Sequence, residues 1–260
     1  MRITKSEIRL LRSLTRKKVR DQQNKFVVEG WRALRDALNS DFHVDLVGFT
    51  HRCVESPDLR TIINDIDSRG IQRRQLTELE MNQVTDTVHA QGVVAIVQQR
   101  SRTLDEVLTK EPSLVVFADR VSDPGNLGTI VRTCDWFGVD AIILSEGCVD
   151  LYNEKVVRST SGSIFHIPVI EHADAKGVVS RLKALNYKIL VTSGDAKTSY
   201  EDMRYGERNV IIVGNEAAGV RDDINRLADG SVCIPRRGNA ESLNVGVACG
   251  IILSHLRNGR

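Results

Sequence analysis

The second half of the chain alternates short apolar runs with helix-like segments, and this pattern constrains the fold more than any other feature. Each run has the length of a strand and is apolar nearly throughout, so neither face of the strand suits water. Strands buried on both faces and separated by helices are typical of a parallel sheet covered by helices. The sequence therefore predicts an α/β domain with strands at Leu114–Ala118, Ala141–Leu144, Lys188–Thr192, Val210–Val213 and Ser231–Pro235, and a further short strand at Ile167–Ile170.

Helical segments fill the gaps between these runs, and the last of them is unusually poor in charge. The helix predicted at Ser242–Leu256 has no charged residue between Val245 and Leu253. A helix that is apolar all round must be buried on more than one side. The sheet and a second subunit would together bury it, whereas a helix buried within a monomer is the alternative. The other helices are predicted at Asn126–Phe137, Asn153–Ser161, Ala175–Leu185 and Asp222–Leu227.

Strands and helices also alternate in the first hundred residues, which predicts a second, smaller α/β unit. Its elements are strands at Phe26–Gly30, Val44–Thr50 and Gly92–Gln99, and helices at Ser6–Val19, Trp31–Asn39, Pro57–Ser68 and Leu76–Val84. The polar stretch that follows contains a short helix at Leu104–Leu108 and ends at Pro112, which cannot continue a helix. The sequence thus predicts one domain over residues 1–100, a linker over 101–112 and a second domain over 113–260.

Positive charge is concentrated at the N-terminus. The whole chain has a formal net charge of +2, yet residues 1–35 hold eleven lysines and arginines against three acids, a local charge of +8. The remaining residues must then carry −6, which is +2 minus +8. This asymmetry favours a polyanionic partner held at one end of the chain, with a solvated helix face as the alternative.

Several classes of protein are disfavoured by what the sequence lacks. The five cysteines are odd in number and contain no C-x-x-C pair, which suggests reduced thiols in the cytoplasm. The six histidines show no metal-ligand spacing, so we expect no metal site. No apolar run approaches the ~18 residues of a membrane span. Neither a G-x-x-x-x-G-K-[ST] phosphate loop nor a G-x-S-x-G nucleophile elbow occurs.

Polar residues and glycines follow the predicted strands in three segments that are far apart in the sequence. These segments are Asp119–Arg132, Val210–Val220 and Cys233–Gly250. Ligands of open α/β sheets bind outside the carboxyl ends of the strands. We therefore expect one site that brings together Asn126, Arg132, Asn215, Glu216, Ser242 and Asn244.

The three segments together resemble the motifs of the SpoU, or TrmH-like, branch of the SPOUT RNA methyltransferases. The likeness covers residues 114–256, with the motifs Asn126-x-Gly128-x-x-x-Arg132, Val213-Gly214-Asn215-Glu216 with Gly219, and Ile234-Pro235 followed by Ser242-Leu243-Asn244-Val245. Near the N-terminus, a second likeness is to the substrate-binding domain of the ribosomal RNA members, which looks like a small RNA-binding ribosomal protein. It rests on Arg16-Lys17-Lys18-x-Arg20 and Phe26–Gly30.

The resemblance implies a parallel-sheet domain tied in a trefoil knot, a homodimer, and S-adenosylmethionine as methyl donor. The acceptor would be a ribose 2′-hydroxyl, most simply in ribosomal RNA. A transfer RNA enzyme of the same branch and a non-catalytic RNA-binding ribosome assembly factor are the alternatives. The nucleotide, and a housekeeping or antibiotic-resistance role, are left open.

The same resemblance assigns roles to individual residues. The donor would contact Thr192, Ser193, Gly194, Val213, Gly214, Asn215, Ile234 and Leu243. Arg132 would act on the donor of the other subunit, together with the catalytic residues Asn126, Glu216, Ser242 and Asn244. RNA would be bound by Arg16, Lys17, Lys18 and Arg20. Phe26 and Trp31 could stack on bases, with burial in the core of the small domain as the alternative.

Overall fold

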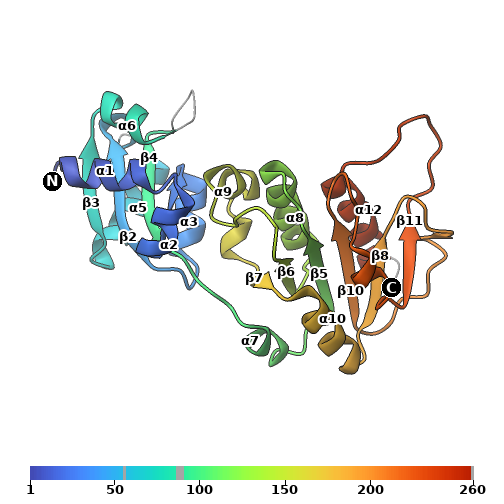
Figure 1. Ribbon diagram of the computed structural model, residues 1–260. Coiled ribbons are helices and arrows are strands. Elements are labelled where there is room, and N and C mark those ends of the chain that lie inside the picture. The colour runs from blue at the N-terminus through green and yellow to red at the C-terminus, as the bar shows by residue number, and fades with distance from the viewer. Residues whose placement is uncertain (55–56, 86–90, 259–260) are drawn as a thin grey trace. The chain divides into compact units, whose positions relative to one another are not determined.

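The computed structural model describes residues 1–54, 57–85 and 91–258, and its chain separates into two compact units (Figure 1). The first unit combines Met1–Arg100 with Tyr152–His166, and the second combines Ser101–Leu151 with Ile167–Arg260. The sequence analysis did not foresee that residues 152–166 belong with the first unit. The predicted boundaries at residues 100 and 113 stay a prediction.

The first unit is built on a four-stranded sheet in the order β1–β4–β2–β3. β4 pairs antiparallel with both neighbours, whereas β2 and β3 are parallel. The strands are β1 (Lys25–Glu29), β2 (Val44–Thr50), β3 (Gln72–Leu76) and β4 (Val93–Gln98). The helices are α1 (Lys5–Ser13), α2 (Lys17–Gln23), α3 (Trp31–Leu38), α4 (His51–Val54), α5 (Pro57–Ser68), α6 (Glu78–Val84), α9 (Glu154–Thr160) and the 3-10 helix η1 (Ser163–Phe165). The sequence analysis missed β3 because all of its residues but the last are polar or charged.

The single helix predicted over Ser6–Val19 is wrong, because the chain forms two helices there, α1 and α2. Arg20 stabilises the break between them: its Nη1 donates to the carbonyl oxygens of Leu14 at 2.9 Å and Thr15 at 2.7 Å. The guanidinium thus satisfies carbonyl groups left unpaired at the end of α1. Arg20 is 2% exposed and turned into the unit, in contrast to the exposed Arg16, Lys17 and Lys18.

The second unit contains the predicted parallel sheet, with strands in the order β7–β6–β5–β10–β8–β11–β9. Every neighbouring pair runs parallel, which confirms the predicted fold class; the trefoil knot stays a prediction. The strands are β5 (Leu114–Asp119), β6 (Ala141–Ser145), β7 (Val169–Ala173), β8 (Lys188–Thr192), β9 (Thr198–Ser199), β10 (Asn209–Gly214) and β11 (Gly230–Cys233). The helices are α7 (Leu104–Leu108), α8 (Pro124–Trp136), α10 (Ala175–Ala184), α11 (Asp222–Asn225) and α12 (Val245–Asn258).

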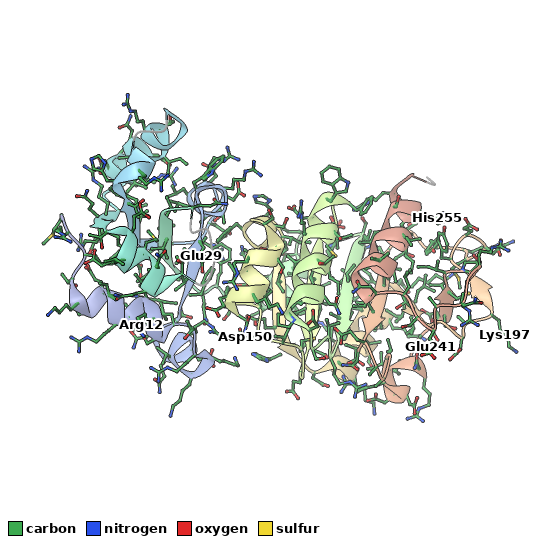
Figure 2. The ribbon with its side chains drawn as sticks, turned by 90° about the horizontal axis from the view of Figure 1, so that it is seen from above. Arg12, Glu29, Asp150, Lys197, Glu241 and His255 are labelled. Atoms are coloured by element: carbon green, nitrogen blue, oxygen red, sulfur yellow. The ribbon has the colours of Figure 1, made fainter. Side chains whose placement is uncertain are left out.

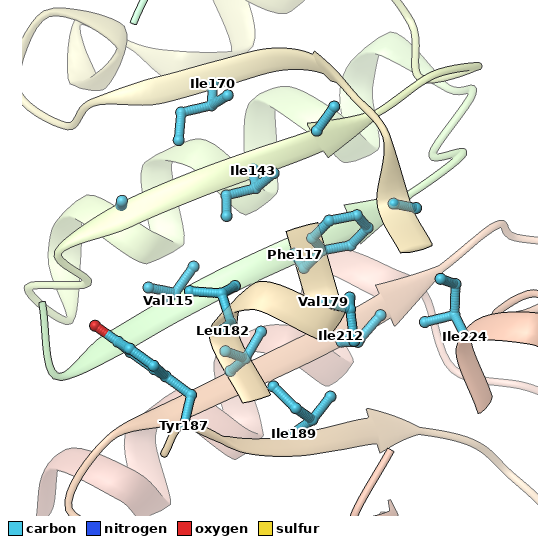
Figure 3. Packing of buried hydrophobic residues seen from close by; sticks show 14 of the residues in the cluster. Val115, Phe117, Ile143, Ile170, Val179, Leu182, Tyr187, Ile189, Ile212 and Ile224 are labelled. Carbon is cyan, nitrogen blue, oxygen red and sulfur yellow. The ribbon is translucent and has the colours of Figure 1, made fainter. Parts of the chain in front are cut away.

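Apolar side chains are buried on both faces of this sheet. On one face, Phe117 of β5 and Ile212 of β10 belong to a core cluster that includes Leu182 of α10 (Figure 3). Side chains alternate between the two faces along a strand, so Val116 and Ile211 point to the opposite face, where they are also fully buried. α12 contacts β10 and packs against α8. The near-continuous apolar character of the strands follows from this double burial.

The order of the strands places a topological switch point beside β5. After β5 the chain forms β6 and β7 on one side and then crosses to β8, which lies beyond β10 on the other. The crevice at the carboxyl ends of strands around such a point is the usual ligand site of an open α/β sheet. None of the helices that the structure describes has both the length and the hydrophobicity for crossing a membrane.

Candidate functional site

The loops that follow β5 and β10 leave the sheet side by side. These strands are parallel neighbours, and Asp119 is the register partner of Gly214 at their carboxyl ends. The loop after β5 leads into α8, whose start is set by Pro124 at the first turn and by Asp123 as the cap. The Asp123 carboxylate accepts a hydrogen bond from the backbone N–H of Asn126 at 2.8 Å. Asn126 is thereby held in the first turn of α8, beside the loop after β10.

Glu216 is the centre of a hydrogen-bond network between these two loops. Its carboxylate accepts hydrogen bonds from Nδ2 of Asn126 at 2.9 Å, from the N–H of Asp123 at 3.2 Å, and from the N–H and hydroxyl of Ser122 at 3.3 and 3.2 Å. Nδ2 of Asn215 adds a longer contact of 3.4 Å. The predicted convergence of Asn126, Asn215 and Glu216 is therefore present in the structure.

This network controls the ionisation of Glu216. Desolvation by partial burial would by itself raise the pKa of the carboxyl group, but the hydrogen bonds from Asn126, Asp123 and Ser122 outweigh it and lower the pKa. Glu216 is therefore ionised near neutral pH, and its oxygens are occupied by donors. Such a carboxylate is suited to orienting other side chains rather than to removing a proton.

Asn244 connects the third segment to the same network. Its Nδ2 donates to Oδ1 of Asn126 at 2.7 Å, while its own Oδ1 accepts from the N–H groups of Gly246 and Val247 at 2.9 and 3.2 Å. Asn244 thus caps α12, which begins at Val245. The predicted start of this helix at Ser242 is wrong for that reason. Ser242 and Leu243 lie in the exposed loop before the helix. The preceding residue of this loop, Glu241, is labelled in Figure 2.

Asp119 is a buried anchor of the site that the sequence analysis did not single out. Its side chain is 0% exposed, accepts from the hydroxyl of Ser145 at 3.1 Å and from the N–H of Arg221 at 3.0 Å, and lies 3.0 Å from Nε of Arg221. The next residue, Arg120, has a left-handed backbone with φ of 56°, and its carbonyl oxygen accepts from Nδ2 of Asn215 at 2.8 Å. The only sequence signal was an acid directly after the five apolar residues Leu114–Ala118.

Gly214 permits the tight turn that presents Asn215 and Glu216. A Cβ at position 214 would lie 2.4 Å from the backbone of Gly219 and Val220, a contact that real structures do not show. The turn closes through two backbone hydrogen bonds between Asn215 and Gly219, of 3.1 and 2.9 Å. Gly219 itself has a φ of 67°, which favours glycine. Gly214, expected to contact a ligand, thus makes room for the chain's own backbone.

The predicted donor residues lie at or just after the ends of β8, β10 and β11, apart from Leu243, which lies in the loop before α12. Thr192 donates its hydroxyl to the carbonyl oxygen of Ile212 at 3.1 Å, and the N–H of Ser193 donates to Val232 at 3.0 Å. A Cβ at Gly194 would meet nothing within 4 Å, so the backbone there faces open space. Further residues of this set are the buried Val213 and Gly214, the half-buried Ile234, and Leu243, whose side chain is 49% exposed.

Arg132 is not part of the Glu216 network. It lies in the second half of α8 on the exposed side, and it forms no hydrogen bond or ion pair with any residue that the structure describes. Next to it, α8 and α12 border an apolar groove. The lining residues are Thr129, Thr133 and Phe137 of α8, Gly246, Val247, Gly250, Ile251, Ser254 and His255 of α12, and Tyr200. His255 lies near the end of α12 (Figure 2).

The described residues contain no group of three or more His, Cys, Asp or Glu side chains arranged to hold a metal ion. The four cysteines whose side chains are described, Cys134, Cys148, Cys233 and Cys249, are free thiols.

Comparison with known protein families matches the same two parts of the chain. A model described as the SpoU rRNA Methylase family matches residues 113–254. A model described as the MRM3-like substrate binding domain matches residues 5–95.

Similar proteins extend over nearly the whole length. The 23S rRNA (guanosine(2553)-2′-O)-methyltransferase RlmP of Bacillus subtilis is 35% identical over 95% of this chain and 94% of its own. The AdoMet-bound structure of an rRNA methyltransferase from Sinorhizobium meliloti has a TM-score of 0.87 at 30% identity, covering 99% of this chain and 96% of that one. The SpoU methyltransferase AviRb of Streptomyces viridochromogenes, in complex with AdoMet, has a TM-score of 0.87 at 25% identity, covering 99% and 98%.

Proposed function

This chain belongs to the SpoU rRNA methylase family and is a methyltransferase that uses S-adenosylmethionine, and we propose that it methylates a ribose 2′-hydroxyl of ribosomal RNA in the cytoplasm. The observation that carries the proposal is the junction of Glu216, Asn126 and Asn244 at the carboxyl edge of the sheet. The names of the full-length relatives and the match of residues 5–95 to a substrate-binding domain support the choice of RNA.

The residues at the ends of β8, β10 and β11, together with Leu243 in the loop before α12, fit the donor. S-adenosylmethionine supplies a methyl group on a positively charged sulfur and carries a flat, largely apolar adenine. The half-exposed Leu243 and the half-buried Ile234 offer apolar contact, and the open backbone at Gly194 offers polar groups without a side chain in the way. The donor's positive charge is lost on transfer, so this edge needs no strong opposite charge.

The residues of this chain would act mainly by positioning the acceptor and by stabilising charge. In the transfer a bond forms between the ribose 2′-oxygen and the methyl carbon, the carbon–sulfur bond breaks, and the hydroxyl proton passes to water. In-line placement of the hydroxyl supplies much of the acceleration. The Arg132 guanidinium stays protonated in proteins and is a poor base. We assign it to binding the RNA phosphate and to stabilising the developing negative charge on the oxygen.

The site is completed by a second copy of the chain. Within one copy, Arg132 lies on the exposed side of α8, away from the Glu216 network. The neighbouring groove exposes apolar surface, and Val247 at its edge is 49% exposed. The charge-free part of α12 lines this groove, which suits burial against an identical helix face. In a symmetric dimer built on this face, each Arg132 would reach the donor site of the partner.

The role of Arg132 is tested by substitution. We expect Arg132→Ala to lower methyl transfer by at least ~10²-fold, the usual cost of losing a charge-stabilising donor. Titration calorimetry should show S-adenosylmethionine binding as in the parent protein, because no donor residue is changed. Light scattering should give the mass of a dimer. A parent-like rate in this variant would overturn the assignment, and a parent that shows no heat with the donor would favour the RNA-binding assembly factor.

Action across the dimer is tested by mixing two inactive variants. The second variant is Leu243→Asp, which should lose donor binding but keep Arg132. In a mixed dimer, one site combines an intact donor surface with an intact Arg132. Random subunit exchange should then restore about a quarter of the parent rate, since half of the dimers are mixed and each has one working site of two. Exchange without recovery would assign Arg132 to its own subunit.

A further inference from the structure

Trp31 and two arginines form a cluster on α3 that the methyl-transfer chemistry does not use. Trp31 is the first residue of α3 and is half-buried, while Arg32 and Arg35 are exposed. The Cζ atoms of both arginines lie 5.4 Å from the centre of the indole ring. These distances are within the ~6 Å of a cation–π contact. The indole and the two guanidinium groups over it therefore form one positively charged group with an aromatic centre, which we call the Trp31 cluster.

The Trp31 cluster is separate from the aromatic core of the first unit. Phe26 is 0% exposed, and its ring centre lies 4.6 Å from that of Tyr152 and 6.2 Å from that of Phe165. Phe42 completes this core, with its ring centre 5.1 Å from that of Phe165. Phe26 is thus a core residue and unavailable to a base. Trp31 belongs neither to the buried core nor to any ring pair among the described residues.

The acidic side chains near the Trp31 cluster neutralise it only in part. Glu29, just before α3, lies 3.3 Å from Nη1 of Arg158. Asp36 lies 4.0 Å from Nε of Arg35, and equally 4.0 Å from Nε2 of His166. Arg32 forms no ion pair within the part of the chain that the structure describes. The cluster therefore has positive charge left for an anionic ligand.

We propose that the Trp31 cluster is a stacking site for an unpaired base of the RNA substrate, with Arg32 and Arg35 holding the phosphates on either side of it. This inference rests on the proposed function and adds to it a named recognition site. Bases in loops and bulges are free to stack on aromatic side chains and guanidinium planes, whereas bases inside a duplex are not. The cluster would thus select RNA with an exposed base. An acidic peptide, the alternative anionic ligand, would bind to the two arginines but would make no use of the indole ring.

Tryptophan fluorescence tests the proposal directly. The chain contains two tryptophans, so Trp136→Phe leaves Trp31 as the single tryptophan, which is excited selectively at a wavelength that tyrosine does not absorb. In that background, a ten-nucleotide single-stranded RNA should quench the emission, and a blunt duplex of the same sequence should quench it far less. Measured by the fluorescence anisotropy of an end-labelled RNA, Trp31→Ala should weaken single-strand binding roughly 5- to 150-fold, the range for one base–aromatic stack, and Trp31→Phe should restore part of it. A thermal melt of each variant checks that the unit is folded.

Charge variants separate stacking from general attraction. We expect replacement of Arg32 and Arg35 with alanine to make the slope of log binding constant against log salt concentration shallower, by the amount that corresponds to about one to two phosphate contacts. The matched control is Arg60→Ala, an exposed arginine on α5, which should leave the quenching unchanged. Equal quenching by duplex and single strand, or parent-like binding by Trp31→Ala, would overturn the proposal.

The failure of this inference is distinguishable from failure of the proposed function. If the Trp31 cluster is not a recognition site, the parent and Trp31→Ala will methylate a ribosomal RNA fragment with the same KM and the same kcat. If the proposed function itself is wrong, the parent will transfer no methyl group to RNA, whatever the fluorescence shows. The expected result is a raised KM for RNA in Trp31→Ala, with kcat and donor binding preserved.

Discussion

Asn126 connects all three motif segments through the two ends of its carboxamide. Nδ2 donates to Glu216 after β10, and Oδ1 accepts from Asn244 before α12. The sequence predicted this convergence because each residue follows a strand or opens a helix at the same edge of the sheet. It could not reveal Asp119, since one acid at the end of an apolar run also fits a solvated loop. It could not place Arg20 either, because a basic residue in a basic stretch gives no sign of turning inward.

Replacement of Glu216 by glutamine should test the network at the scale of single residues. The amide keeps the size of the side chain but replaces one acceptor oxygen with a donor, so the N–H groups of Ser122 and Asp123 lose part of their partner. We expect methyl transfer to fall by up to ~10²-fold through misplacement of Asn126. S-adenosylmethionine binding, measured by calorimetry, should change much less. A parent-like rate would remove Glu216 from the positioning network.

The same substitution predicts a dependence on pH. Folding lowers the pKa of Glu216 below its ordinary value of 4.5, so its contribution to stability is present above that value and is lost as the pH falls through the lowered one. The difference in thermal stability between parent and Glu216→Gln should therefore be constant near neutral pH and shrink in acid. The control is Glu241→Gln, an exposed acid in the loop before α12, which should change the thermal stability little at neutral pH.

At the scale of elements, the crossing of α8 and α12 depends on small residues facing threonines. A Cβ at Gly246 would lie 2.8 Å from Cγ2 of Thr129, and one at Gly250 would lie 3.4 Å from Cγ2 of Thr133. The composition of α12 predicted a close approach but not which element approaches. That partner is set by the order of the strands, a long-range property that local periodicity does not contain.

A double-mutant cycle should measure this close approach. Gly246→Ala should destabilise the protein by about 1–3 kcal/mol, because the added methyl group clashes with Cγ2 of Thr129. Thr129→Ser removes that carbon and keeps the hydroxyl that donates to the carbonyl of Gly125 at 2.8 Å. In the serine background, Gly246→Ala should cost clearly less in chemical denaturation. Strictly additive free energies of unfolding would contradict the close crossing.

Element boundaries were predictable where hydrophobic periodicity and capping agree. The strand Val44–Thr50 and the helix Pro57–Ser68 have the predicted bounds. The predicted boundaries were wrong where a single side chain sets the end of a helix by hydrogen bonds that the local sequence pattern does not reveal. Arg20 separates α1 from α2, and Asn244 delays the start of α12 beyond Ser242. β3 is a strand only because β2 offers it a partner, which its polar sequence does not reveal.

At the scale of the whole molecule, residues 152–166 join the first unit although both flanking segments belong to the second. Phe165 and Tyr152 carry this attachment, because their rings pack on the fully buried Phe26. Sequence analysis placed all of this segment in the second domain, since a linear boundary is the simplest division. Nothing in the local pattern of α9 shows which core it joins.

Removal of this contact should destabilise the first unit. We expect Phe165→Ala, at a side chain that is 6% exposed, to cost about 3–5 kcal/mol, as for other buried aromatic residues. Calorimetric unfolding should show the loss in one transition while S-adenosylmethionine still stabilises the other. The matched control is Lys155→Ala on the exposed side of α9, which should be within about 0.5 kcal/mol of the parent. An unchanged transition in Phe165→Ala would contradict the division into units.

The chain changes from one unit to the other three times, after residues 100, 151 and 166, and this limits how the choice of substrate can change in evolution. A recognition module joined by one linker can be replaced by a single recombination event. Here the first unit includes residues 152–166, which are encoded between two segments of the second unit, after Leu151 and before Ile167. A chimaera made by exchanging only the first hundred codons would join Phe26 from one lineage to Tyr152 and Phe165 from another. We therefore expect related enzymes with a new RNA substrate to arise by gradual substitutions on the surface of the first unit. The alternative route is the joint transfer of both gene segments that encode this unit.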